Sequence, residues 1–191
     1  MILTITTISY SQVTEFTFTK DGLTDYVVTQ CEGKTQSEIY KKCVDWIAFT
    51  YKNPQSVTQA KIENEYIRVE AISESLICDN KAMYGKVCRD GKYTLEISFK
   101  DGKYKFEILK IEKFLEATNN STPPNYPDRW MPVKTKSSES NNFVYDKGKR
   151  KGEISSFFKY YNEIAIYFNG LNKQLSDFVL NKEIPSKKSE W

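Results

Sequence analysis

The sequence predicts an α+β fold in which helices cover an antiparallel sheet, in the order strand, helix, several strands and a long C-terminal helix. Two alternating runs flank the turn dipeptide Asp101-Gly102, which is the pattern of a β-hairpin. A capping box, Thr35-x-x-Glu38, opens a run with helical spacing. Residues 153–180 repeat apolar side chains at intervals of three and four positions, as an amphipathic helix does.

The first part of this order consists of short strands and one helix. Residues 13–19 alternate polar and apolar side chains, and residues 26–31 are rich in β-formers, so both segments are expected to be strands. The helix begins at Thr35 and ends before Asn53-Pro54, because a residue that precedes proline avoids helical dihedrals. Its buried side is expected to carry Ile39, Cys43, Trp46 and Ile47.

The hairpin at Asp101-Gly102 has a well-defined expected register. A two-residue loop places each apolar side chain of one strand opposite an apolar side chain of the other. The expected pairs are Phe99 with Tyr104, Ile97 with Phe106, and Leu95 with Ile108. The opposite face of the same strands is polar and of mixed charge, with Thr94, Glu96, Ser98, Lys105 and Glu107.

Two further turns are predicted before this hairpin. A two-residue loop at Asn64-Glu65 keeps small or apolar residues on one face. Its expected pairs are Ile62 with Ile67, Ala60 with Val69, and Thr58 with Ala71. At Asp90-Gly91 a three-residue loop ending at Lys92 is preferred, because it sets Val87 rather than Lys86 opposite Leu95. About four or five antiparallel strands therefore follow the first helix.

The last predicted element is a helix from about Glu153 to Leu180. Its apolar seam consists of Ile154, Phe157, Tyr161, Ile164, Phe168, Leu171, Leu175 and Phe178, widened by Phe158, Ala165 and Val179. Two interpretations stay open: a helix laid across the sheet, or a helix that forms a coiled coil or docks on a partner. The large aromatic residues favour the sheet, since close two-helix seams prefer Leu, Ile and Val.

Composition divides the chain into four parts. Residues 1–12 resemble a signal peptide that lacks its basic start, and a first β-strand is the alternative. Residues 13–116 are expected to form the α+β domain, and residues 117–142 a linker rich in Pro, Ser and Asn. Residues 143–191 hold the long helix and a tail. No other stretch has the roughly 20 apolar residues that span a membrane.

Two loop regions carry side chains that a partner could contact. Within the linker, Tyr126, Trp130 and Met131 either bind a partner or, as is more common, anchor the linker on the domain. The basic run of residues 147–151 is able to touch acidic lipids or polymers, although a charge run before a helix is usually only solvated.

The chain has four cysteines, Cys31, Cys43, Cys78 and Cys88. An exported protein can pair them in three ways, between which the sequence does not choose. Cys43 lies on the apolar side of the predicted helix, where a buried free thiol is the commoner explanation. If one disulfide forms, Cys78–Cys88 is the expected pair. The sequence has no C-x-x-C spacing, so it supports neither a thioredoxin-like redox motif nor a zinc ribbon.

Several segments resemble a Bacteroidetes family of domains of unknown function with a TBP-like fold, of the DUF4468 type. These segments are residues 18–28, 33–42, 46–54, 60–69 and the hairpin at 101–102. The resemblance covers about residues 16–112 and contains no catalytic motif. It implies a curved antiparallel sheet with helices on one face, an exported bacterial protein and no established activity.

Histidine is absent from the chain, which excludes Ser-His and Cys-His nucleophile pairs, imidazole acid–base catalysis and His-containing zinc sites. A hydrolase or lyase built on carboxylates or lysines remains possible. The candidate carboxylates are Glu63, Glu65, Glu70 and Glu74. Because they are spread along predicted strands, they are interpreted as surface residues. No catalytic, metal-binding or cofactor-binding residue is therefore predicted, and no cofactor is expected.

Charge argues against nucleic acid as a partner. The 28 basic and 25 acidic residues give a net charge of +3, whereas a binder of phosphate groups usually shows a strong basic stripe. The predicted function is a non-enzymatic binding or interaction module of the bacterial cell envelope, periplasmic or secreted, with a protein, peptide or glycan as partner. A structural or oligomerising protein that uses the C-terminal helix is the first alternative, and a carboxylate-based hydrolase is the second.

Overall fold

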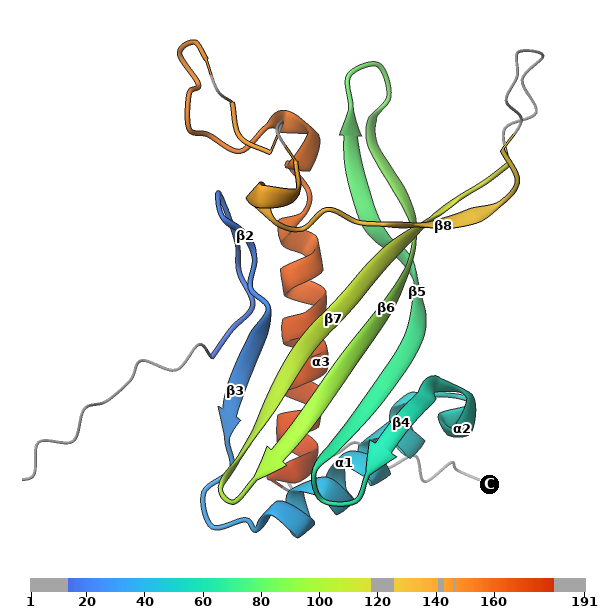
Figure 1. Cartoon of the computed structure of the whole chain (residues 1–191), viewed down its shortest axis with the longest axis vertical. Coiled ribbons are helices and arrows are strands. Elements are labelled where there is room, and N and C mark those ends of the chain that lie inside the picture. The colour runs from blue at the N-terminus through green and yellow to red at the C-terminus, as the bar shows by residue number, and fades with distance from the viewer. Residues whose placement is uncertain (1–13, 118–125, 141–142, 146, 181–191) are drawn as a thin grey trace, which may run out of the picture.

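The computed structural model describes residues 14–117, 126–140, 143–145 and 147–180. A strongly curved antiparallel sheet of six strands forms one layer, and the helices α1 and α3 cover one of its faces (Figure 1). The long helix α3 runs along the sheet, and α1 crosses it near one end. The predicted α+β class is confirmed. The predicted leader, residues 1–12, and the tail after residue 180 lie outside the described residues.

The elements follow one another along the chain as predicted in outline. The strands are β1 (Phe18–Thr19), β2 (Gly22–Leu23), β3 (Tyr26–Gln30), β4 (Thr58–Ile62), β5 (Tyr66–Lys81), β6 (Gly85–Lys100), β7 (Lys103–Leu115) and β8 (Arg129–Pro132). The α-helices are α1 (Gln36–Thr50), α2 (Pro54–Val57) and α3 (Asn162–Val179), and the 3-10 turns are η1 (Ser137–Glu139) and η2 (Ser156–Phe158).

The sheet has the strand order β3-β7-β6-β5-β4, and β8 also pairs with β7. Residues 103–107 of β7 pair with β3, whereas residues 112–115 pair with β8. Since β6 occupies the other edge of β7, β3 and β8 follow one another along the same edge. Strand β8, which lies in the predicted linker, thus extends the sheet. The domain boundaries at residues 116 and 142 stay a prediction.

The local predictions with strong turn and cap signals are confirmed. Thr35 caps α1 by accepting a hydrogen bond from the Glu38 N–H, and the Glu38 carboxylate accepts one from the Thr35 N–H at 2.7 Å. The buried residues of α1 are the four expected ones, Ile39, Cys43, Trp46 and Ile47. The hairpin at Asp101-Gly102 has the predicted register, with the pairs Phe99 with Tyr104, Ile97 with Phe106, and Leu95 with Ile108.

The register predicted at Asn64-Glu65 is wrong. The structure pairs Ile62 with Tyr66, Lys61 with Ile67, and Thr58 with Val69. The loop is one residue longer because Asn64 adopts a positive φ of 62°, which asparagine tolerates in tight turns. A bulge between Thr58 and Ala60 then shifts the register again, so that Thr58 pairs with Val69 while Ala60 pairs with Arg68.

The turn predicted at Asp90–Lys92 is also wrong, and Val87 does not face Leu95. Strands β5 and β6 form one long hairpin joined by residues 82–84, and β6 continues straight through Gly91. Glycine is needed there for close approach, because a Cβ atom at Gly91 would lie 2.8 Å from the Leu76 Cβ. The irregularity lies in β5, where the register shifts between Ser73 and Ile77.

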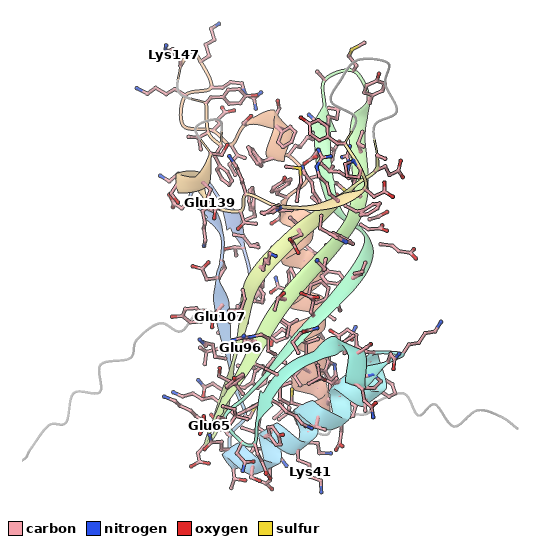
Figure 2. The ribbon with its side chains drawn as sticks, turned by 45° about the vertical axis from the view of Figure 1, so that its right-hand side comes forward. Lys41, Glu65, Glu96, Glu107, Glu139 and Lys147 are labelled. Carbon is pink, nitrogen blue, oxygen red and sulfur yellow. A yellow bond between two sulfur atoms is a disulfide. The ribbon has the colours of Figure 1, made fainter. Side chains whose placement is uncertain are left out.

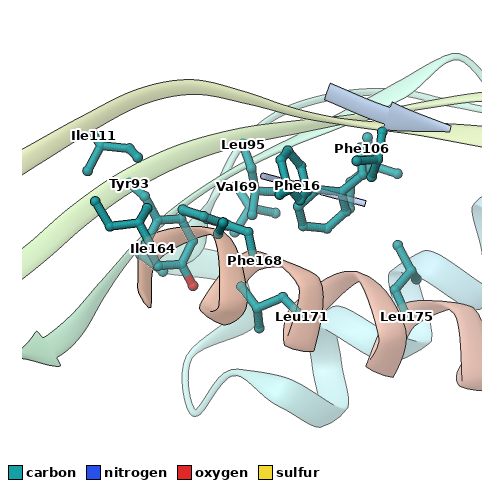
Figure 3. Close-up of a cluster of buried hydrophobic side chains, with 14 of the residues drawn as sticks. Phe16, Val69, Tyr93, Leu95, Phe106, Ile111, Ile164, Phe168, Leu171 and Leu175 are labelled. Atoms are coloured by element: carbon teal, nitrogen blue, oxygen red, sulfur yellow. The ribbon is translucent and has the colours of Figure 1, made fainter. Parts of the chain in front are cut away.

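Helix α3 packs on the sheet, as the first of the two interpretations proposed (Figure 3). The Phe168 ring lies 5.3 Å from the Tyr93 ring and 6.0 Å from the Phe16 ring, and Leu171 and Leu175 are buried. The helix begins at Asn162 rather than near Glu153. The preceding residues instead form the η2 turn and a bridge between Val144 and Ile154, which place their apolar side chains around a cavity.

The N-terminal segment is held by α3 through a side chain. The Asn169 Oδ1 accepts a hydrogen bond from the Phe16 N–H at 2.7 Å, and the Asn169 Nδ2 donates to the Phe16 carbonyl at 2.9 Å. Phe16 is 2% exposed and packs against Phe106. The Asn169 side-chain amide therefore takes the place of a neighbouring strand in binding the Phe16 backbone. A strand was expected to begin at residue 13, but the first strand of the described residues begins at Phe18.

The cysteines follow the expectations. Cys78 and Cys88 form a disulfide across the β5–β6 hairpin, which confirms the expected pair. Cys31 and Cys43 are buried free thiols. Burial raises the pKa of the Cys31 thiol to about 11, so this thiol stays protonated at neutral pH.

Candidate functional site

A cavity of about 650 Å³ lies at the end of the sheet where β7, β8 and residues 133–161 meet. Lys113 of β7 and Met131 of β8 contribute one side of it. Val144, Phe157 and Tyr161, from the segment that leads into α3, contribute the other. The volume lies in the range of small-molecule and peptide side-chain sites, and most of the wall is apolar or aromatic.

A buried ionic cluster supports the wall. Asp79 of β5 is 1% exposed. Its carboxylate accepts hydrogen bonds from the Lys113 Nζ at 2.9 Å and from the Tyr161 hydroxyl at 3.1 Å, and the Arg89 guanidinium lies at 3.5 Å. A buried charge persists only when it is paired in this way. Because an ammonium has three donors, Lys113 keeps donors for a further acceptor beside Asp79.

The Phe157 ring lies close to two lysines. The Lys113 Nζ and the Lys81 Nζ are each 5.7 Å from the centre of its ring, within the range of cation–π attraction. Burial and the neighbouring Asp79 carboxylate both raise the pKa of Tyr161, so its hydroxyl is a permanent neutral donor. The orientation of Lys113 is therefore determined by Asp79 on one side and by an aromatic face on the other.

The rim of the cavity carries Lys134 and the Tyr145 hydroxyl. The Tyr145 hydroxyl donates to the Ser156 Oγ at 3.0 Å and accepts from the Ser156 N–H at 3.1 Å, and these bonds lower its pKa. Among the described residues that line the cavity, the charged ones are Lys113 and Lys134. The described lining thus combines apolar and aromatic side chains with two cationic groups.

The outer face of the sheet, where binding through the sheet was expected, has a different character (Figure 2). Arg68 lies 2.7 Å from Glu96, and Lys105 pairs with Glu107. Burial alone would raise the pKa of Glu112, but Lys110 and Lys92, at 2.8 and 3.0 Å, hold it below its usual value. The predicted mixture of charges is present, and these side chains neutralise one another.

The four candidate carboxylates are not assembled into a site. Glu63 and Glu65 are exposed at the β4–β5 turn, and Glu74 is exposed at the irregularity of β5. Glu70 accepts a hydrogen bond from the Thr94 hydroxyl at 3.3 Å on the outer face. None of the four lines the cavity beside Lys113. Within the part of the chain that the structure describes, no group of three or more Cys, Asp or Glu side chains could hold a metal ion.

The structure confirms the anchoring role for Trp130, whereas partner binding by the three linker residues stays a prediction. The Trp130 ring packs 5.2 Å from the Phe114 ring, with the Lys92 Nζ 5.1 Å from its centre, so Trp130 anchors β8. Tyr126 is covered by the Arg129 guanidinium at 4.4 Å. Met131, by contrast, lines the cavity. Sequence reasoning missed Asp79, whose signal was a lone carboxylate directly after the apolar residues 76–78.

The architecture defines an antiparallel α+β protein of the TBP-like class, and comparison with known proteins identifies the family that the central segment of the chain matches. Residues 26–113 match the model of DUF4468, the domain of unknown function with TBP-like fold. This match confirms the resemblance predicted for that part of the chain. Lys113 is the last matched residue, so the wall formed by β8 and residues 133–161 lies outside the matched segment.

Two solved structures are similar. A TBP-like protein from Parabacteroides distasonis ATCC 8503 is 17% identical with a TM-score of 0.53, and the match covers 83% of this chain and 92% of that one. A DUF4468 family protein from Bacteroides ovatus ATCC 8483 is 14% identical with a TM-score of 0.52, and covers 83% and 86%. At these identities the likeness shows the fold alone. No curated protein matches the sequence. Among the described residues, no helix is both long and apolar enough to cross a membrane.

Proposed function

We propose that the protein is an exported, non-enzymatic binding module whose ligand enters the cavity beside Lys113. The observation that carries this proposal is a lysine that is oriented by a buried carboxylate and lines an otherwise apolar and aromatic cavity. Such a cavity with a few convergent polar groups is the usual form of a ligand site. The described lining residues are mainly apolar and aromatic, which supports a binding role for the cavity.

Among protein, peptide and glycan partners, the cavity favours the end of a peptide chain. Glycans need many hydrogen-bonding groups, whereas this wall is mainly apolar, with Val133, Val144 and Phe157. A C-terminal carboxylate next to an apolar side chain matches both the apolar wall and the two lysines, Lys113 and Lys134.

An extracytoplasmic location is part of the proposal. The Cys78–Cys88 disulfide is compatible with it, because disulfides persist in oxidising compartments and are rare in the cytosol. The composition of residues 1–12 supports it as well. The structural alternative, assembly through the C-terminal helix, loses its main support, because the seam of α3 is buried within the protein itself.

The test is binding of fluorescently labelled short peptides that end in Leu-Phe, followed by fluorescence anisotropy. The free carboxylate is expected to bind at least about tenfold more tightly than the amidated peptide, because only the former is charged. Val144→Trp should abolish binding by filling the cavity, and Lys134→Gln should weaken it several-fold. Lys100→Gln is the matched control, since Lys100 is exposed and distant from the cavity lining. Equal binding of both peptides, unaffected by Val144→Trp, would contradict the proposal.

A further inference from the structure

We propose that the end of the molecule formed by residues 82–84 and 147–151 docks on an anionic lipid surface. This inference is independent of the peptide-binding proposal. It commits to a bilayer as the partner, because the two segments place an apolar tip and a basic loop at the same end of the molecule. These are the two signals whose combination gives stable attachment to a membrane surface, whereas either alone is marginal.

The apolar signal is the turn of the β5–β6 hairpin. Met83 and Tyr84 are 87% and 79% exposed, the highest values among the large apolar side chains of the described residues. The hairpin projects past the end of α3 into solvent (Figure 1). The Cys78–Cys88 disulfide joins its two strands shortly before the turn, so the tip is presented on a stiff support. Isolated exposed apolar residues are common, but two neighbours at the apex of a projecting hairpin form a surface that is available for insertion.

The basic signal is the loop of residues 147–151. Lys147, Lys149 and Lys151 are all exposed. The loop is shaped by Gly148 and Gly152, whose φ angles of 79° and 83° favour glycine. Close to an anionic bilayer, each such lysine contributes an attraction that decays within a Debye length.

Both segments lie at the same end of the molecule. Figure 2 shows Lys147 at this end and Lys41 at the other. Asn80 of the hairpin and Arg150 of the loop line one surface pocket, together with Lys159, which adds positive charge at this end. The Lys86 Nζ lies 2.7 Å from the Glu163 carboxylate and so joins the hairpin to the start of α3. A flat anionic surface can therefore contact the tip and the loop together.

The exposed tip distinguishes a bilayer from a soluble polyanion. A polyphosphate or an acidic polymer would satisfy the lysines but would leave Met83 and Tyr84 in water. Tyrosine is favoured at the boundary between lipid and water, where its ring is buried and its hydroxyl is solvated. The unbranched methionine side chain adapts to an irregular apolar environment. The combination thus fits lipid better than any partner that is only charged.

The experiment is co-sedimentation of the full chain with vesicles of phosphatidylcholine alone, or of an equal mixture of phosphatidylcholine and phosphatidylglycerol. Binding is expected only to the mixture, and it should weaken with added salt. The triple variant Lys147→Gln, Lys149→Gln, Lys151→Gln should lower the partition coefficient roughly 100-fold. Its matched control removes the same charge from exposed lysines at the other end, with Lys41→Gln, Lys52→Gln and Lys61→Gln, and should change it less than about twofold.

The tip is tested with Met83→Ser combined with Tyr84→Ser, which should lower partitioning roughly tenfold. The control is Ile72→Ser with Ile166→Ser, because these side chains are 60% and 63% exposed but lie outside the proposed surface. Lack of binding to anionic vesicles would overturn the proposal, as would an equal loss in the controls. If only the lysine variant lost vesicle binding, and soluble polyphosphate competed with the vesicles, the partner would be a polyanion and the membrane proposal would be wrong. Unchanged circular dichroism spectra should accompany every variant.

Discussion

The two ends of the sheet are built on different principles. Around the Asp101-Gly102 turn and α1, apolar side chains face each other in pairs, the helix is capped, and Ile97, Phe106 and Ile39 are fully buried. At the other end the protein buries a carboxylate, closes a hairpin with a disulfide and leaves a cavity. The regular end, which lies within the matched segment 26–113, supplies the hydrophobic stabilisation. The irregular end holds the cavity, the hairpin tip and the basic loop on which both proposals depend.

The largest effect is expected in the regular core. Phe168→Ala should lower the free energy of unfolding by about 4 kcal/mol, because a fully buried ring between α3 and the sheet is removed and a cavity remains. Urea denaturation followed by circular dichroism measures it. Ile166→Ala, on the same helix but 63% exposed, is the control and should cost less than about 0.5 kcal/mol. Similar costs for both variants would refute the packing of α3 on the sheet.

The irregular end should depend on its buried charge. Asp79→Asn is expected to cost about 3 kcal/mol, because Lys113 and Arg89 then lose their counter-charge in a mainly buried setting. Replacing Glu163 by Gln breaks the exposed ion pair with Lys86 and should cost less than about 1 kcal/mol. If the two variants were equally stable, Asp79 would not be the organising residue of this end.

The disulfide should contribute less to the free energy of unfolding than Asp79 does, and its effect should be confined to the β5–β6 hairpin. Replacing Cys78 and Cys88 by Ser is expected to cost about 2.5 kcal/mol, since the bond closes a short loop of the unfolded chain. Hydrogen exchange should accelerate at the β5–β6 tip and stay unchanged at the Asp101-Gly102 hairpin. A reducing agent should reproduce the effect in the unmodified protein. Uniform acceleration across the sheet would show that the two ends are not energetically distinct.

The smallest effect concerns pH on the outer face. Lys110 and Lys92 hold the pKa of folded Glu112 below the ordinary 4.5, so its contribution to stability is present above that pH and is lost as pH falls through the folded value. Glu112→Gln should therefore be less stable than the unmodified protein at neutral pH, and the difference should shrink at an acidic pH well below 4.5. Urea titrations at both pH values measure it. A difference that persists in acid would assign the effect to packing instead of charge.

The comparison also explains what the sequence could predict. The capping box at Thr35 and the register at Asp101-Gly102 depend on neighbouring residues, and both were predictable. The Asp90-Gly91 dipeptide carries the same local turn signal, but there glycine serves to admit Leu76 from the adjacent strand. Glycine is favoured both in a tight turn and where two strands approach closely. Only the tertiary contact with Leu76 shows that the second reason applies at Gly91.

The cavity was beyond sequence reasoning for a related reason. Its walls come from β7, β8 and the residues before α3, which are distant in the chain and meet only in the folded state. The helical periodicity of residues 153–161 was misleading. The side chains of Phe157, Phe158 and Tyr161 line the cavity, but their backbone precedes α3 and is not part of this helix. Periodicity reports which side chains are buried but not which backbone conformation buries them.

The amide of Asn169 has a consequence for the order in which the protein can be made. It binds the backbone of Phe16, which precedes it by 153 residues, and Phe16 then fills the space between the sheet and α3. During synthesis the core must therefore remain open until α3 has left the ribosome, even though nearly all strands are already available. Completion of the core is therefore tied to the synthesis of α3, which is the last helix among the described residues.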